Sequence, residues 1–365
     1  MIDDAFEPID ATARRRIRES LEETLLVEAG AGTGKTYSLV SRVVELVAGG
    51  HALMGRLAAI TFTDAAAAEL RDRIREGLER RAAAAVDDDE RARCERGAAA
   101  LDQAAIQTLH GFAGALLRER PLEAGLPPTL EVLDDVQAGM LFEDAWQAWL
   151  DTALDRTDLL QPLRVALSLG MTIGHLREAA RLFHNRYDLV REAHFQDVPL
   201  PQPAAAGMLA VALPELDALC GLANMGEDDA LVGHVREVSR IAARVIEDSA
   251  DSTRVWRLLA RSPSLTSRRG KQQDWDTDPA TGIKGCQVIR ERLKDLQALV
   301  DQELAEVRRA ALMPLLQALR GFVLDYVEQR KRLGQAEFHD LLVWARDLLR
   351  DNILVRDYFR ARFSH

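Results

Sequence analysis

The sequence predicts an α/β protein in which a parallel-sheet domain is interrupted by a large, all-helical insertion. Between residues 20 and 135, three short apolar runs are each followed by a turn and a segment with helical periodicity. From 136 to 335 the strand signals vanish, and apolar residues recur at helical spacing. From 336 to 365 another amphipathic helix returns the chain to the first domain. We therefore predict two structural parts, the first of them discontinuous in sequence.

The first strand–turn–helix unit contains the most informative residues of the chain. Leu25, Leu26 and Val27 predict a strand, and apolar residues from Leu39 onward predict a helix. Between them lies a glycine-rich turn with the sequence Ala29-Gly30-Ala31-Gly32-Thr33-Gly34-Lys35-Thr36. Glycine permits positive φ and a close approach of the main chain, and amides at a helix N-terminus bind anions. The turn therefore predicts a site for a nucleoside triphosphate.

Two side chains at the end of this turn have expected roles. Lys35 would meet the β- and γ-phosphates, and the Thr36 hydroxyl would ligate Mg²⁺. Lys35 is the only lysine before residue 271, in a region where all other cationic chains are arginines. A compact ammonium acts as a point charge among phosphate oxygens, in contrast to a planar guanidinium. Ala29 stands where the strict pattern has glycine, so the match is one residue short.

Two further units complete the predicted α/β part. The run 57–60 leads through Thr61-Phe62-Thr63-Asp64 into an alanine-rich helix, with Thr63 or Asp64 as its N-cap. Residues 79–100 predict a solvated helix with a loop that includes the acidic run 87–90. The third unit places Thr108 and His110 at another strand-to-helix junction.

Composition restricts the class of protein. The three cysteines lie far apart without metal-ligand spacing, which indicates a reducing compartment and no zinc or iron–sulfur site. The N-terminus lacks a hydrophobic targeting core, and no run of 18 apolar residues occurs, so we expect a cytoplasmic protein that spans no membrane. The net charge of −11 disfavours a small, purely electrostatic DNA-binding module. Local patches, however, decide nucleic-acid binding.

The helical part contains breaks at 199–203 and 262–285, and a helical apolar stretch that runs from Leu293 and resumes at Leu315. Trp146 and Trp149 are expected in its core. Between residues 254 and 273 there are six basic residues and no acidic one, among them Arg268 and Arg269. This patch could contact duplex phosphates, and the alternative is an exposed flexible loop beside a solvated helix.

Four segments together resemble one protein family. VEAGAGTGKT, AAITFTDAAAAELRDRI and IQTLHGFAGALLRE with AGLPPTLEVLDD occur in the order found in superfamily 1 DNA helicases of the UvrD/Rep group. Within that group they look closest to the RecB and AddA branch of helicase–nuclease subunits. The stretch Tyr326…Lys331…Phe338-His339-Asp340-Leu341-Leu342 is similar to the family segment ahead of motif II. The four segments bracket residues from about 10 to 363.

The resemblance implies three domain segments and a motor activity. Residues 1–135 would be the N-terminal part of an incomplete RecA-like P-loop NTPase domain, 136–335 a helical insertion, and 336–365 a return segment that ends before motif II. The implied activity is ATP-driven translocation along single-stranded DNA and unwinding at junctions with duplex, in recombination and repair. Other subunits of a helicase–nuclease complex are possible partners.

The resemblance also implies DNA contacts. Thr61 and Thr63 have short hydroxyls suited to a phosphate, and Phe62 could stack on a base. Thr108 and His110 would hold a neighbouring nucleotide. The alternatives are a buried strand position for Phe62 and a capped surface histidine at position 110.

Some positions depart from the family pattern. Arg14 aligns with the glutamine that reads adenine, which puts the base contact in doubt. Tyr37 replaces the arginine often found after Gly-Lys-Thr and could stack on adenine instead.

Hydrolysis in this class requires a strand that ends in Asp-Glu, together with arginines from a second domain. Neither is found in the sequence. The acidic pair Asp134-Asp135 follows an apolar run, but it occupies the place of the family's EVLD segment ahead of the insertion. We therefore expect a truncated chain that binds ATP without useful hydrolysis. The alternative is a natively short nucleotide-binding interaction module without motor activity, and a P-loop kinase is a weaker third possibility.

Overall fold

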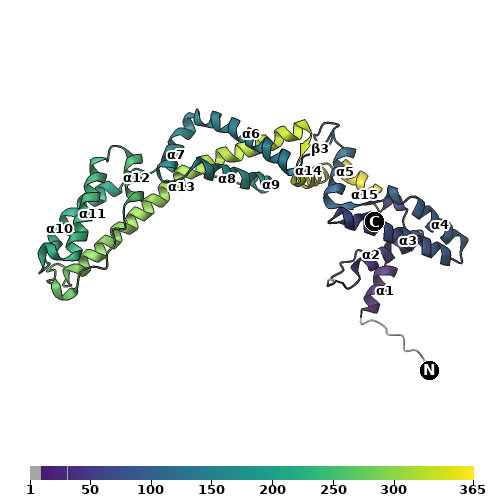
Figure 1. Ribbon diagram of the computed structural model, residues 1–365, viewed down its shortest axis with the longest axis horizontal. Helices are drawn as coiled ribbons and strands as arrows, with labels where there is room; N and C mark the ends of the chain where they lie inside the picture. The colour runs from purple at the N-terminus through teal and green to yellow at the C-terminus, as the bar shows by residue number, and fades with distance from the viewer. Residues whose placement is uncertain (1–9, 31) are drawn as a thin grey trace, which may run out of the picture. The chain divides into compact units, whose positions relative to one another are not determined.

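The computed structural model describes residues 10–30 and 32–365. In this part the protein is mostly helical and has two small parallel sheets (Figure 1). The chain divides into two compact units, the first comprising residues up to 138 together with 329–365, the second comprising 139–328. The boundaries fall within two helices, α6 (Asp135–Leu154) and α13 (Gly285–Leu333).

The first unit contains strands β1 and β2, which form one parallel pair, and β3 and β4, which form another. Its remaining elements are helices. In chain order the first unit has α1 (Ala11–Glu19), α2 (Lys35–Ala48), β1 (Ala58–Thr61), α3 (Asp64–Ala84), α4 (Asp88–Ala99), β2 (Ala105–Thr108), α5 (Leu109–Glu119), β3 (Glu131–Val132), β4 (Gln335–Ala336), α14 (Phe338–Asp351) and α15 (Ile353–Arg362).

Two of the three predicted strands are present in the structure. The second and third are confirmed as β1 and β2, which pair in register from Ala58 opposite Ala105 to Thr61 opposite Thr108. The prediction of a strand at Leu25–Val27 is wrong, because residues 24–30 form an irregular segment. Leu26 is 100% exposed there. A strand requires a hydrogen-bonded neighbour, and the β1 amide of Ala58 donates instead to the carbonyl of His365, at 2.9 Å.

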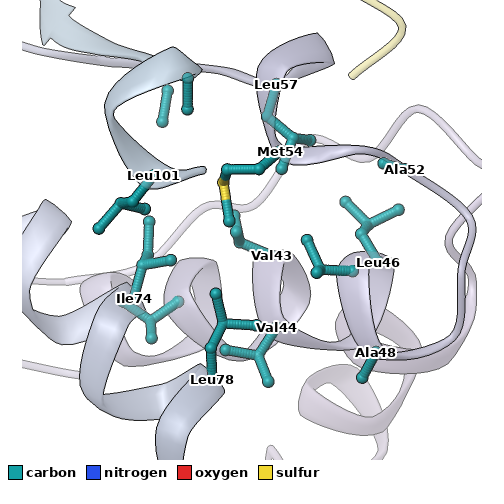
Figure 2. Close-up of a cluster of buried hydrophobic side chains, with 14 of the residues drawn as sticks. Val43, Val44, Leu46, Ala48, Ala52, Met54, Leu57, Ile74, Leu78 and Leu101 are labelled. Carbon is teal, nitrogen blue, oxygen red and sulfur yellow. The ribbon is translucent and has the colours of Figure 1, made fainter. Parts of the chain in front are cut away.

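The core of the first unit forms around α2 and α3. Valines and leucines on one face of α2 pack against Ile74 and Leu78 of α3, and Met54 and Leu101 close the cluster (Figure 2). Ile74 and Leu78 are completely buried. Because α2 begins at Lys35, burial of this face fixes where the end of the glycine-rich turn lies.

The acidic run 87–90 is not the solvated loop that we expected. The Asp87 carboxylate accepts hydrogen bonds from the amides of Asp89 and Glu90, each at 3.2 Å, and so caps α4. Carboxylates are favourable at a helix N-terminus, where amides are unpaired and the dipole is positive. One face of α4 is buried through Cys94 and Gly97.

The second unit is entirely helical apart from isolated bridges. Besides parts of α6 and α13 it contains α7 (Thr157–Ser168), α8 (Ile173–His184), α9 (Tyr187–Val190), α10 (Ala205–Cys220), α11 (Ala230–Glu247) and α12 (Ser252–Arg261). The two predicted helical stretches around 293 and 315 belong to one continuous helix of 49 residues, α13. Figure 1 shows α10, α11 and α12 beside its N-terminal half.

Buried polar groups join the helices of the second unit. Glu303 on α13 accepts hydrogen bonds from the amides of Ala204 and Ala205 and from the Trp256 indole, at 3.0, 2.7 and 2.8 Å. A buried carboxylate is tolerated because each of its oxygens is paired. Trp146 is buried, as expected, and lies 5.1 Å from Trp149 between ring centroids.

Helix α13 contains one window that is long and apolar enough to cross a membrane by length and composition. The window has 18 residues, and half of it is buried inside the structure. Burial of this kind is what a core helix of a helical bundle provides.

The close packing of α2 against α4 predicts the effect of one substitution. A methyl group added at Gly97 would lie 2.6 Å from Val47 Cγ1, and a buried β-branched side chain in a helix has little rotamer freedom. Although alanine has the higher helix propensity, we expect Gly97→Ala to lower the free energy of unfolding by about 1–2 kcal/mol. Urea denaturation combined with hydrogen exchange of α2 and α3 amides measures this.

Gly114→Ala in α5 is the matched control. The nearest atom to the added methyl group there is the flexible end of Arg118, at 3.1 Å. This variant should be neutral or slightly more stable, by up to about 1 kcal/mol. Equal effects of the two substitutions would contradict the packing of α4 on α2.

Candidate functional site

The glycine-rich turn leads directly into α2. Gly32 has φ +75° and Gly34 has φ +87°, values that side-chain-bearing residues rarely adopt. Gly34 is the N-cap of α2, so Lys35 and Thr36 occupy its first turn. Ala31, which the sequence placed in this site, lies outside the described residues. The N-terminus of α2, whose first amides have no partner within the helix, thus lies at the end of the turn.

Lys35 folds over the turn that precedes it. Its Nζ donates hydrogen bonds to the carbonyls of Ala29 and Gly30, at 2.6 and 2.7 Å. The Thr33 hydroxyl donates to the Gly30 carbonyl at 2.8 Å. These bonds connect the end of the turn to its beginning, and Lys35 remains exposed. Thr36 and Tyr37 are exposed beside it.

Arg14 contacts the turn, a contact that the sequence did not predict. Its Nη2 donates to the Thr33 carbonyl at 2.8 Å, while its Nε donates to Asp10 Oδ2 at 2.9 Å. The hydrogen bond with Asp10 raises the pKa of the Arg14 guanidinium above its usual value, and the same bond lowers the pKa of Asp10. Arg14 can be singled out in the sequence because it departs from the family pattern. The atoms that its side chain contacts, however, depend on how α1 packs.

A cavity of about 570 Å³ lies beside the segment that precedes the turn. Its lining is mixed: apolar residues of α2, β1 and β2 share it with polar and charged residues such as Glu22, Glu23 and Arg42. Among the lining residues are Leu25, Leu39, Val43, Leu46, Leu57, Ala59, Ile74 and Ile106. The segment that was predicted to be a strand therefore borders this cavity.

A second group of predicted site residues gathers where β1 and β2 end. Thr61 and Thr108 are directly opposite in the parallel register, so Phe62 and Leu109 follow side by side. Phe62 is 96% exposed, which excludes a buried strand position for it. Thr63 caps α3 by accepting from the Ala66 amide at 3.1 Å.

Thr108 caps α5 in the same way, by accepting from the Gly111 amide at 3.1 Å. A threonine hydroxyl that accepts one bond keeps its hydrogen for a second partner. Both Thr63 and Thr108 can therefore donate to an anion at a helix N-terminus, where the dipole is favourable.

His110 packs against an aromatic residue from the far end of the chain. Phe338, the first residue of α14, lies 5.4 Å from His110 between ring centroids, in an edge-to-face arrangement. Phe338 is more than half exposed. The sequence did not single it out as a site residue, although it belongs to a segment that carried the family resemblance.

A buried ion pair holds the start of α14. Asp340 is 1% exposed and bonds to the Arg330 guanidinium through both carboxylate oxygens. Asp340 Oδ2 also accepts from the amide of Glu337 at 2.7 Å. These bonds fix the turn before Phe338 and hence its ring beside His110.

The predicted basic patch lies in the second unit. Arg254, Arg257 and Arg261 are spaced along one face of α12, and Arg268 and Arg269 follow in the connecting loop, all of them exposed. Arg254 Nε lies 2.9 Å from Asp248 Oδ2. The loop is held by Arg290, whose Nε donates to the Arg269 carbonyl at 3.0 Å. The side chains of the patch thus project from a backbone that α13 holds in place.

In the part of the chain that the structure describes, no group of three or more histidine, cysteine or acidic residues could hold a metal ion. The acidic pair at 134–135 opens α6, where Asp134 Oδ1 accepts from the Gln137 amide at 2.8 Å. Thr36, the second residue of α2, follows the glycine-rich turn directly.

The chain is similar in sequence to known proteins. The UvrD/REP helicase N-terminal domain profile matches residues 10–365. An ATP-dependent helicase/nuclease subunit from Anoxybacillus flavithermus is 25% identical over 93% of this chain and 31% of its own length. The proteins of the same name from Enterococcus faecalis and Pelotomaculum thermopropionicum are 37% and 39% identical over 35% and 32% of this chain, and about a tenth of their own length. The chain thus spans less than a third of the first of these relatives.

Proposed function

The chain belongs to the UvrD/REP helicase N-terminal domain family, and on this premise we propose that it is the nucleotide-binding and DNA-contacting part of an ATP-dependent DNA helicase of recombination and repair. The first unit would be the RecA-like P-loop part, and the second unit its helical insertion. The observation that carries the proposal is the glycine-rich turn, whose two positive-φ glycines place Lys35 and Thr36 in the first turn of α2.

The residues of the turn fit a triphosphate. Amides of the turn and of the first turn of α2 would bind phosphate oxygens, and Lys35 would exchange its carbonyl partners for the β- and γ-phosphates. Thr36 would contribute one ligand to Mg²⁺, which in such sites keeps several waters and takes phosphate oxygens as further ligands. The exposed ring of Tyr37 would stack on the base.

The proposal assigns nucleotide binding rather than hydrolysis to these residues. The carboxylates that follow an apolar run, Asp134 and Asp135, open a helix and do not end a strand of the β1–β2 sheet. The bound Mg²⁺ would neutralise phosphate charge, and the chain's own contribution is to orient the triphosphate.

Single-stranded DNA would cross the ends of β1 and β2. Phe62 offers an exposed ring to an unstacked base, and the hydroxyls of Thr63 and Thr108 can donate to phosphates. Phe338 orients His110 for a neighbouring nucleotide through its edge-to-face contact. Acting on DNA, such a protein would work in the cytoplasm, and the names of the relatives suggest further subunits as partners.

Nucleotide binding depends on the Lys35 ammonium in this proposal. Lys35→Ala should weaken Mg-ATP binding by at least about tenfold, because charge-assisted bonds to phosphate are lost. Isothermal titration calorimetry of the intact chain measures the dissociation constant. Lys294→Ala removes an exposed lysine of α13 and serves as the control of equal charge. Unchanged affinity in Lys35→Ala would overturn the nucleotide site.

DNA binding depends on stacking at Phe62. Phe62→Ala should weaken binding of a fluorescent oligothymidine by about 5- to 150-fold, since stacking contributes about 1–3 kcal/mol per base. Stacking carries no charge, so the loss should persist when the salt concentration is raised. Val86→Ala shortens another almost fully exposed apolar side chain and should bind as the wild type does. A loss that vanishes at high salt would contradict stacking.

The basic patch of the second unit would contact duplex phosphates. Replacing both Arg268 and Arg269 by alanine should reduce the slope of log affinity against log salt concentration by about 2, measured with a DNA hairpin that carries a single-stranded tail. The adjacent, exposed arginines Arg308 and Arg309 of α13 provide the matched double substitution. A slope that changes equally in both double variants would assign the effect to net charge and discard the patch.

A further inference from the structure

Arg14 links the start of α1 to the glycine-rich turn. It lies on α1, it is paired with Asp10, and its Nη2 donates to the Thr33 carbonyl at 2.8 Å. A methyl group added at Gly34 would lie only 3.2 Å from Arg14 Nη1. The guanidinium therefore lies against the peptide that joins Thr33 to Gly34.

This contact orients one peptide group. A trans peptide is planar, and its C=O and N–H point in opposite directions. Because Arg14 holds the Thr33 carbonyl on the α1 side of the turn, the Gly34 amide hydrogen points to the opposite side. Without that bond the peptide could rotate, since Gly34, the residue that follows it, restricts the backbone least.

We propose that Arg14 is a positioning residue for the phosphates of the nucleotide, acting through the Thr33–Gly34 peptide and not through the base. The inference rests on the proposed nucleotide site and adds a residue to it. At the position where relatives of the family were expected to read adenine, this chain uses a guanidinium to brace the turn.

The partners of Arg14 support a bracing role over base recognition. Its Nε and Nη2 both lie within hydrogen-bond distance of Asp10 Oδ2, at 2.9 and 2.8 Å, while Nη2 also reaches Thr33. Asp10 precedes α1 and is four residues from Arg14, so the pair lies along one side of that helix. The carboxylate thus holds the guanidinium plane in the orientation that the Thr33 carbonyl needs.

The test compares two ligands that share phosphates but not a base. Mg-ATP and magnesium tripolyphosphate are titrated by calorimetry into the full chain and into Arg14→Ala. We expect about a three- to tenfold loss of affinity for both ligands, with equal factors, because the lost interaction acts on phosphate. A loss confined to ATP would identify a base contact and overturn the inference.

Arg16→Ala is the matched control. It removes an arginine of the same helix whose partner is the exposed Glu23, at 2.7 Å, and it should bind both ligands as the wild type does. Equal losses in the two alanine variants would reduce the effect to net charge and overturn the inference. Arg14→Lys separates charge from geometry: full recovery would overturn bracing, whereas partial recovery supports it, because an ammonium lacks the planar fork.

Asp10→Asn provides a second test of the inference if Arg14→Ala folds poorly. It loosens the guanidinium without touching the turn, so we expect about a two- to fivefold loss in the wild-type background and no added loss in Arg14→Ala. Additive losses would show that Asp10 acts independently and would overturn the coupling. If the wild type takes up neither ligand, the nucleotide site itself is refuted. If the wild type binds both and Arg14→Ala binds equally well, only this inference fails.

Discussion

Burial of one face of α2 is the constraint on which the first unit depends. Val43, Val44 and Val47 pack against α3 and α4, and this packing fixes the axis of the helix and the place where it begins. Helices gain most of their stability from such a face and little from propensity. The glycine-rich turn, which has few apolar side chains of its own, is therefore positioned by a core that lies behind it.

The threonines at the ends of β1 and β2 combine a structural role with a hydrogen-bond donor that remains available. Thr63 and Thr108 each cap a helix, and each keeps a hydroxyl hydrogen for another partner. Parallel pairing brings the two caps to the same edge of the β1–β2 sheet, where two helix N-termini also lie. Hydroxyl hydrogens and the positive ends of two helix dipoles would all attract an anion at this edge. Anion binding here would therefore not require a basic protein overall.

In the second unit, buried polar groups specify which helices pack together. Its long helix α13 carries a buried carboxylate, Glu303, that receives two main-chain amides at the start of α10 and an indole from α12. Asp229, at the start of α11, similarly accepts from the Leu231 amide and from the Trp275 indole, at 2.7 and 3.0 Å. Such paired polar groups specify which helices meet, since any other arrangement would leave a buried carboxylate unpaired.

What the sequence by itself determined was local. The glycines and Lys35 of the turn, the apolar runs of β1 and β2, the cap at Thr63 and the breaks of the helical unit all follow from neighbouring residues, and the structure has them where the pattern indicated. The matched family supports the order of the motifs. These features are predictable because backbone freedom, capping and periodicity act over a few residues.

Tertiary structure decided the rest. Leu25, Leu26 and Val27 have strand propensity but no strand to pair with, so they remain irregular. The contact of Phe338 with His110 joins residues 228 positions apart, and Arg14 Nη2 reaches the Thr33 carbonyl, a contact that no pattern identifies. In each case the outcome depends on a partner that is distant in the sequence, and the position of that partner is set by the packing of whole elements.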